Sequence, residues 1–269
     1  MNGSAHSTPT ATGRFWSGAA LGFGVLAAAN AVLLGYAWIH FALANPAYFA
    51  DDWPTFSRAL TLQNVLYPAL AALAGTGLFA GGWALALMQW ERARKNPALR
   101  APLMVRALCG LVAAALGVVH YFHVTVTLSV DNDAHMALAF AFFFGMSLLI
   151  AADLVCSVAL EKRGLRDAAA APRRVRTHHR VGAGVIAAAA AFLVTFVLKD
   201  AAWNPWASAT QKAFVCFEAL WVTLAHAYAV LYVVPLRRHF GVEPTGAAAR
   251  VRRLASSAAV VLVGAAACT

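Results

Sequence analysis

The feature of this sequence that most constrains its fold is a series of apolar stretches between Phe15 and Leu236, several of them longer than about 20 residues. A helix of about 20 residues crosses the ~30 Å hydrocarbon core of a bilayer. Inside lipid, only α-helices and closed barrels satisfy all of their backbone polar groups. The apolar stretches lack the alternation typical of barrel strands. The sequence therefore predicts an all-α fold, a polytopic transmembrane helix bundle.

Six spans are expected, separated by polar or proline-containing segments. Hydrophobic residues make up 61% of the chain and charged residues only 12%, far from the composition of a soluble domain. The predicted spans cover residues 15–44, 61–90, 103–128, 135–160, 181–198 and 212–236.

The two ends of the chain are expected to lie outside the six-helix domain 15–236. Residues 1–14 are small and polar and predict a disordered cytoplasmic tail. Residues 237–269 predict a basic cytoplasmic tail with a short apolar stretch, 254–268. That stretch is shorter than a usual span, so it is either membrane-associated or a seventh span.

The basic residues predict the orientation. Of the 21 Lys and Arg residues, one lies in the N-terminal tail, five in linker 91–106, seven in linker 161–180 and five after Leu236. Only three lie in the alternate loops, so the positive-inside rule places both termini in the cytoplasm. The net charge of +10 therefore fits anionic lipid headgroups and needs no nucleic-acid partner. We expect the protein in a bacterial inner membrane.

The orientation can be tested with single cysteines in a cysteine-free background. An impermeant thiol reagent is expected to label Asn132→Cys in intact cells and to label Ala170→Cys only after the membrane is opened. Inversion would require moving eighteen basic residues across the membrane, since that many lie on the predicted inner side. The reverse labelling pattern would contradict the prediction. Labelling of Thr269→Cys in intact cells would mean seven spans.

Ionisable residues inside the spans are the candidate functional residues, because their burial in lipid is costly. Most of them are predicted to gather in the outer half of the bundle, around an outward-facing polar groove. His120 and His123 are one helical turn apart, so they share a helix face. Asp153, near the inner end of the fourth span, is the exception. The predicted groove residues are Glu218, His135, His120, His123, Trp221 and His226.

Several roles remain open for these residues. The histidines could form hydrogen bonds at the membrane interface, and Glu218 could anchor two helices. A metal-dependent lipid hydrolase could use the histidines together with Asp131, and a haem-binding bundle or an acyl-transfer protein are further alternatives. Because no spacing among these residues is distinctive, no catalytic residue is assigned, and binding of membrane lipid is favoured over catalysis. No metal or other cofactor is predicted.

Three segments of the sequence form a pattern together. The first outer loop has Trp53-Pro54-Thr55-Phe56-Ser57, and the fourth span opens with His135 followed by Phe140. The last outer loop and span have Trp203-Asn204-Pro205 and Phe217-Glu218-Ala219-Leu220-Trp221. These segments resemble the DRAM-like superfamily, which groups the damage-regulated autophagy modulators with the Frag and Sfk proteins and a GPI-anchor remodelling factor. The resemblance implies six spans, cytoplasmic termini and a role in membrane-lipid organisation or remodelling.

Overall fold

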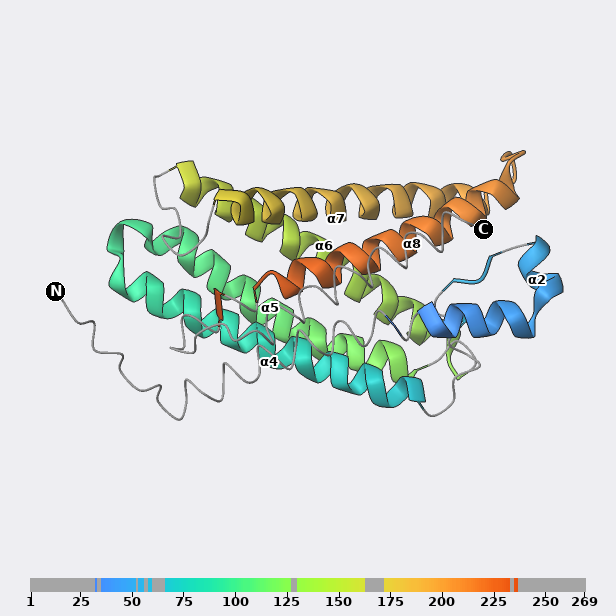
Figure 1. Cartoon of the computed structure of the whole chain (residues 1–269), viewed down its shortest axis with the longest axis horizontal. Coiled ribbons are helices and arrows are strands. Elements are labelled where there is room, and N and C mark those ends of the chain that lie inside the picture. Colours follow the sequence, from blue (N-terminus) through green and yellow to red (C-terminus); the bar gives the residue numbers. More distant parts are fainter. Residues whose placement is uncertain are drawn as a thin grey trace.

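A computed structural model of the chain is all-helical in its described part (Figure 1). Helices account for 90% of the structure, and no strand occurs among the described residues. The structure describes residues 32, 35–51, 53–55, 58–59, 66–126, 130–162, 172–232 and 235–236.

In the described part of the chain, five long helices and two short ones have defined bounds, and residues 35–44 are also helical. The short helices are α2 (Pro46–Asp51) and the 3-10 helix η1 (Pro97–Leu99). The long helices are α4 (Leu66–Lys95), α5 (Arg100–Thr125), α6 (Asn132–Lys162), α7 (Pro172–Lys199) and α8 (Ala207–Val230). Helices α4 and α6 end, and α5 and α7 begin, at one end of the bundle, which we call the basic end (Figure 1). The other end is the opposite end.

Local side-chain interactions fix where these helices begin and end. At the opposite end, the Oδ1 atom of Asp131 accepts a hydrogen bond of 2.9 Å from the backbone N–H of Ala134, so Asp131 caps α6. In the turn between α7 and α8, the Asn204 amide donates to the carbonyl of Leu198 over 2.8 Å. At the basic end, Pro172 is the first residue of α7. The N–H of a first helical residue has no acceptor within the helix, so a proline loses no hydrogen bond there.

Helices α4 and α5 pack backbone against backbone through glycines. A Cβ atom added at Gly82 would lie 2.5 Å from the carbonyl oxygen of Gly110, and one added at Gly110 would lie 2.6 Å from the amide nitrogen of Ala86. Such contacts are closer than any real Cβ atom makes. Small residues permit this approach, which favours helix association in lipid, where no hydrophobic drive pairs the helices.

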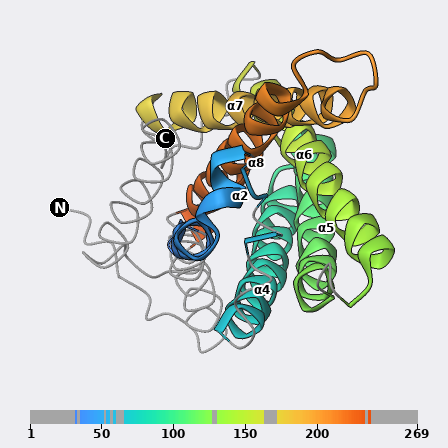
Figure 2. The same ribbon diagram turned by 90° about the vertical axis from the view of Figure 1, so that its right-hand side faces the viewer.

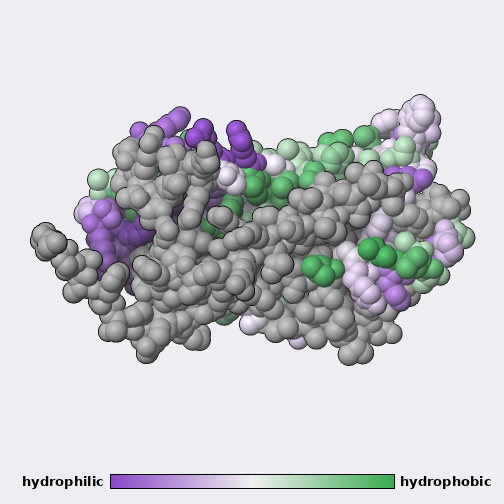
Figure 3. Space-filling model, in the orientation of Figure 1, coloured by the Kyte–Doolittle hydropathy of each residue, from purple (hydrophilic) through white to green (hydrophobic). Residues whose placement is uncertain are grey.

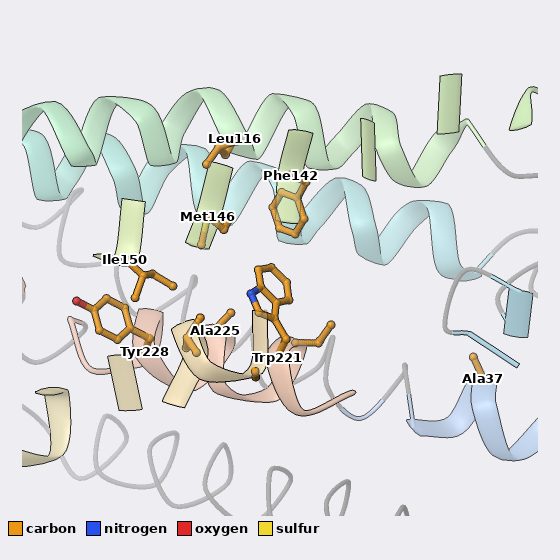
Figure 4. Packing of buried hydrophobic residues seen from close by; sticks show 11 residues of the cluster. Ala37, Leu116, Phe142, Met146, Ile150, Trp221, Ala225 and Tyr228 are labelled. Carbon is orange, nitrogen blue, oxygen red and sulfur yellow. The ribbon is translucent and has the colours of Figure 1, made fainter. Parts of the chain in front are cut away.

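Helix α8 lies in the interior of the bundle, between α7 and the α5–α6 pair (Figures 1 and 2). Its inner face joins one hydrophobic core with residues of α5, α6 and α7. Trp221 and Phe142 point toward one another, and Ile150 lies beside Tyr228 (Figure 4). The buried members of this core are Ala37, Leu116, Phe142, Met146, Ile150, Val185, Ala188, Trp221, Val222, Ala225 and Tyr228.

The predicted all-α membrane fold is confirmed at the level of its helices. Four helical segments of the described chain are long and apolar enough to cross a bilayer, namely Pro97–Thr125, Asn132–Lys162, Arg176–Lys199 and Ala207–Val230. They overlap the third to sixth predicted spans. The count of six spans and the cytoplasmic termini stay predictions. Tail 1–14, tail 237–269 with its stretch 254–268, and residues 15–31 of the first predicted span lie outside the described residues.

The outer surface of these helices is apolar between polar ends. Hydrophilic residues gather at the basic end, and hydrophobic residues line much of α7 (Figure 3). Large apolar side chains such as Leu148, Val155 and Val197 are exposed on α6 and α7. A soluble protein rarely exposes apolar surface on this scale, whereas lipid covers such a surface in a membrane protein.

Two segments that were predicted as basic linkers are partly helical. Linker 91–106 includes the start of α5, so Arg106 lies within the helix, and linker 161–180 includes the start of α7. Long basic side chains reach the interface from a helix end, so a helix can extend past the hydrocarbon without losing solvation of its charges. Arg106 is different, because it is buried and paired inside the bundle.

Candidate functional site: two buried polar clusters

The first polar cluster lies in the half of the bundle near the opposite end. It consists of His120 and His123 on α5, His135 on α6 and His226 on α8, and we call it the histidine cluster. The ring centroids of His123 and His135 lie 4.7 Å apart, and those of His120 and His123 lie 6.0 Å apart. His226 lies close enough to His120 for the two imidazoles to interact electrostatically. The antiparallel α5–α6 pair therefore brings together residues that the sequence grouped.

Backbone carbonyls orient two of these rings. The Nδ1 atom of His135 lies 2.7 Å from the carbonyl oxygen of Val126, and that of His226 lies 2.7 Å from the carbonyl oxygen of Val222. A carbonyl oxygen only accepts hydrogen bonds, so Nδ1 carries the proton in both histidines. In a neutral ring with this tautomer, Nε2 holds the lone pair. Two rings of the cluster therefore present a hydrogen-bond acceptor.

The other two rings carry buried nitrogens that lack hydrogen bonds. Both ring nitrogens of His123 and the Nδ1 atom of His120 are buried, with no hydrogen-bond partner among the described residues. The His123 residue is only 7% exposed. Leaving a buried polar group unsatisfied costs about 1–3 kcal/mol. This arrangement destabilises the bundle unless a polar group reaches the rings.

Trp221 and Glu218 connect less directly to the cluster. The Phe142 ring stacks on His120 at 4.3 Å between centroids and meets the edge of Trp221 at 6.0 Å. The Trp221 indole N–H also donates to the Oγ atom of Ser147 over 2.9 Å. Glu218 is buried on α8, one helical turn before Trp221. Five of the six predicted residues are thus linked through rings or charge, and Glu218 lies beside them along α8.

The second polar cluster lies nearer the basic end, and the sequence did not predict it. Asp153 is 1% exposed and accepts hydrogen bonds from α5, from α8 and from the turn that follows α8. The Arg106 Nε–H donates to Oδ1 over 2.7 Å, the Tyr228 hydroxyl donates to Oδ2 over 2.6 Å, and the Tyr232 hydroxyl also donates to Oδ2. We call this group, with His178 of α7, the Asp153 network.

Proton positions in the Asp153 network follow from its geometry. The Tyr228 hydroxyl gives its only proton to Asp153, so it accepts at its contact of 2.9 Å with the Nε2 atom of His178. That nitrogen therefore carries a proton. The Tyr232 hydroxyl likewise accepts from the Nη2 atom of Arg106 over 2.6 Å. The network joins α5, α6, α7 and α8, and its buried carboxylate is fully hydrogen-bonded.

One signal in the sequence points to this network. Asp153 is a lone carboxylate within a span, which by itself requires a partner. Arg106 and His178 fall in the predicted basic linkers 91–106 and 161–180, which concealed them as partners of Asp153. The contacts also cross long sequence separations, 47 residues between Arg106 and Asp153 and 75 between Asp153 and Tyr228.

Along α6, an apolar layer separates the two clusters. Phe142 contacts the histidine cluster and Asp153 lies in the second network, and between them Met146 and Ile150 are buried in the core (Figure 4). On α8 the clusters are closer, because His226 and Tyr228 are two residues apart. The two clusters are therefore separate along α6 and adjacent along α8.

A metal or haem site finds no geometric support in the described part of the chain. Among those residues, no group of three or more His, Cys, Asp or Glu side chains is arranged to hold a metal ion. Asp131, which a metal-dependent hydrolase would use, is exposed and caps α6. The described residues therefore favour neither the metalloenzyme nor the haem alternative.

No family model matches the chain, and no curated protein or solved structure matches it either. The function must be argued from the residues themselves. Four apolar helices of spanning length, with an apolar outer surface, identify the class of protein. The chain is an integral membrane protein.

Proposed function

We propose that this integral membrane protein binds a membrane lipid through the histidine cluster and takes part in membrane-lipid organisation or remodelling. The observation that carries the proposal is His123, buried inside the bundle with two unsatisfied ring nitrogens. A neutral imidazole offers one donor and one acceptor. A headgroup with hydroxyl, amine or phosphate groups satisfies both, so binding such a group offsets the cost of burying the rings.

The surroundings of the cluster favour a lipid over a water-soluble ligand. Tyr121 and Phe122, next to the cluster on α5, expose 40% and 49% of their surface, and lipid surrounds such faces in a bilayer. His135 opens α6, which places it at the level of the headgroups if α6 spans the membrane. The positive-inside rule orients this end outward, and the resemblance to the DRAM-like superfamily also favours a lipid-related role.

Native mass spectrometry of the purified protein tests this function. Phospholipid is expected to co-purify with the wild-type protein. His123→Phe, which keeps the ring and removes both nitrogens, and the double variant Glu218→Ala, His135→Ala should each retain lipid about tenfold less well, equivalent to ~1.4 kcal/mol. The matched control is His40→Phe, because His40 is an exposed histidine that stacks on Tyr36 outside the cluster.

A folding measurement separates loss of the site from loss of the fold. His123→Phe removes two unsatisfied buried nitrogens, so the lipid-free variant should unfold at the same temperature as the lipid-free wild type or above it. Unchanged lipid retention in both cluster variants would rule out this site. Equal loss in His40→Phe would show that retention does not depend on the cluster.

A further inference from the structure

A polar stripe runs along the last turns of α6 toward the basic end. Asp153, Ser157 and Glu161 follow one another at four-residue spacing, so they lie on one helix face. Two consecutive histidines of α7 face this stripe. His178 joins the Asp153 network, whereas His179 contacts the other two members of the stripe.

His179 lies between a hydroxyl and a carboxylate. Its Nε2 atom is 3.3 Å from the Oγ atom of Ser157, and its Nδ1 atom is 3.8 Å from the Oε2 atom of Glu161. The carboxylate favours the proton on Nδ1, which leaves the lone pair on Nε2, toward the serine. In that tautomer the Ser157 hydroxyl donates to His179. This is the order of groups in a nucleophile, a general base and an orienting acid.

The Ser157 hydroxyl differs from that of the other serine of α6. Ser147 donates to the carbonyl oxygen of Phe143 over 2.7 Å and accepts from Trp221, so its proton is held by its own helix. Within the described part of the chain, Ser157 makes one hydrogen bond, to His179. Its proton is therefore directed at a base.

The relay is also placed where a substrate could reach it. The side chains of His179 and Glu161 are 23% and 42% exposed. Helix α6 has 31 residues and is about 46 Å long, compared with ~40–45 Å for a bilayer with its headgroups. Ser157, about 7.5 Å from the end of α6 at Lys162, then lies at the boundary of the hydrocarbon, where the acyl esters of phospholipids sit.

We propose that Ser157, His179 and Glu161 form a catalytic relay that hydrolyses carboxylic esters of membrane lipids at the basic end of the protein. This activity goes beyond lipid binding by the histidine cluster.

The reaction proceeds in two balanced steps. The Oγ atom of Ser157 attacks the ester carbonyl carbon while its proton passes to the Nε2 atom of His179. The bond between the carbonyl carbon and the alcohol oxygen breaks, and the alcohol leaves with the proton from His179. Water then attacks the acyl-serine, its proton passes through His179, and the fatty acid and free Ser157 are released.

A fluorophosphonate probe tests the relay on the full-length protein in lipid nanodiscs. The wild-type protein is expected to form a covalent adduct, located at Ser157 by mass spectrometry. Ser157→Ala should remove the adduct, and His179→Asn should slow its formation at least about a hundredfold, because a general base contributes that much. Glu161→Gln should slow it less. Hydrolysis of a fluorogenic acyl-ester lipid should follow the same order.

Ser147→Ala is the matched control, since it removes a serine hydroxyl from the same helix, and it should be labelled at the wild-type rate. Absence of an adduct at Ser157 in the wild-type protein would overturn the proposal. Equal labelling of His179→Asn and wild type would also overturn it, because a hydrogen bond that only joins α6 to α7 does not activate the serine. Lipid retention by the histidine cluster should be unchanged in Ser157→Ala, so either site can fail independently of the other.

Discussion

Arg106→Leu is expected to lower the free energy of unfolding by about 3–5 kcal/mol, because it leaves the buried carboxylate of Asp153 without its cation. Arg106 and Asp153 have side chains only 11% and 2% exposed, so water cannot replace the lost partner. The Tyr232 hydroxyl also loses the hydrogen bond that it accepts from Arg106. The measurement is reversible unfolding of the purified protein in mixed micelles. The control is Arg100→Leu, an exposed arginine in the first turn of α5, which should change stability by less than about 0.5 kcal/mol.

The double variant Arg106→Leu, Asp153→Leu separates the cost of an orphaned charge from the value of the ion pair. Replacing both charges by apolar side chains is expected to recover most of the loss, since a buried ion pair is often matched by apolar packing. A double variant as unstable as the sum of the two single variants would show that the charges do not interact. The whole interpretation of the Asp153 network would then be wrong.

Gly110→Ala is expected to destabilise the bundle by about 1–3 kcal/mol, because the new methyl group meets backbone and not a movable side chain. The added Cβ atom would lie 2.6 Å from the amide nitrogen of Ala86 and 2.7 Å from the carbonyl oxygen of Gly82. Helices α4 and α5 must then move apart along their shared face. Unfolding in the same micelles measures the effect.

Gly184→Ala is the control for Gly110→Ala. A Cβ atom there would lie 3.1 Å from one methyl carbon of Leu224, which can rotate away. Alanine also favours a helix over glycine by about 0.5–1 kcal/mol, so Gly184→Ala should be neutral or stabilising. Equal losses at both positions would mean that the close approach of α4 and α5 contributes nothing specific to stability.

The sequence predicted the helices well because their signal is local. Apolar length alone located α5, α6, α7 and α8, and depth along the spans predicted that His123 and His135 would lie in the same half of the bundle. The helix boundaries were less accurate, since α8 ends at Val230 and the predicted span at Leu236. That end depends on packing of Tyr232 against residues of α4, which no local pattern encodes.

The Asp153 network could not be derived from the sequence for a different reason. Hydropathy and charge counts treat Arg106 and His178 as parts of basic linkers, because each follows other basic residues. Only the packing of α5 and α7 against α6 shows that both face Asp153. Tyr228 and Tyr232 gave no signal at all, since a tyrosine near the end of a span is ordinary at a membrane interface. A rule that seeks a cation for every carboxylate within a span would have found Arg106.

The apolar layer between the two polar clusters has an electrical consequence. A continuous line of titratable groups across a bilayer would conduct protons and dissipate the membrane potential, which amounts to about 2.3 kcal/mol per charge at 100 mV. On α6, Met146 and Ile150 are 6% and 0% exposed and interrupt that line between the His123–His135 pair and Asp153. Along α6 these apolar residues therefore hinder proton movement between the two clusters, whereas along α8 a single residue separates His226 from Tyr228.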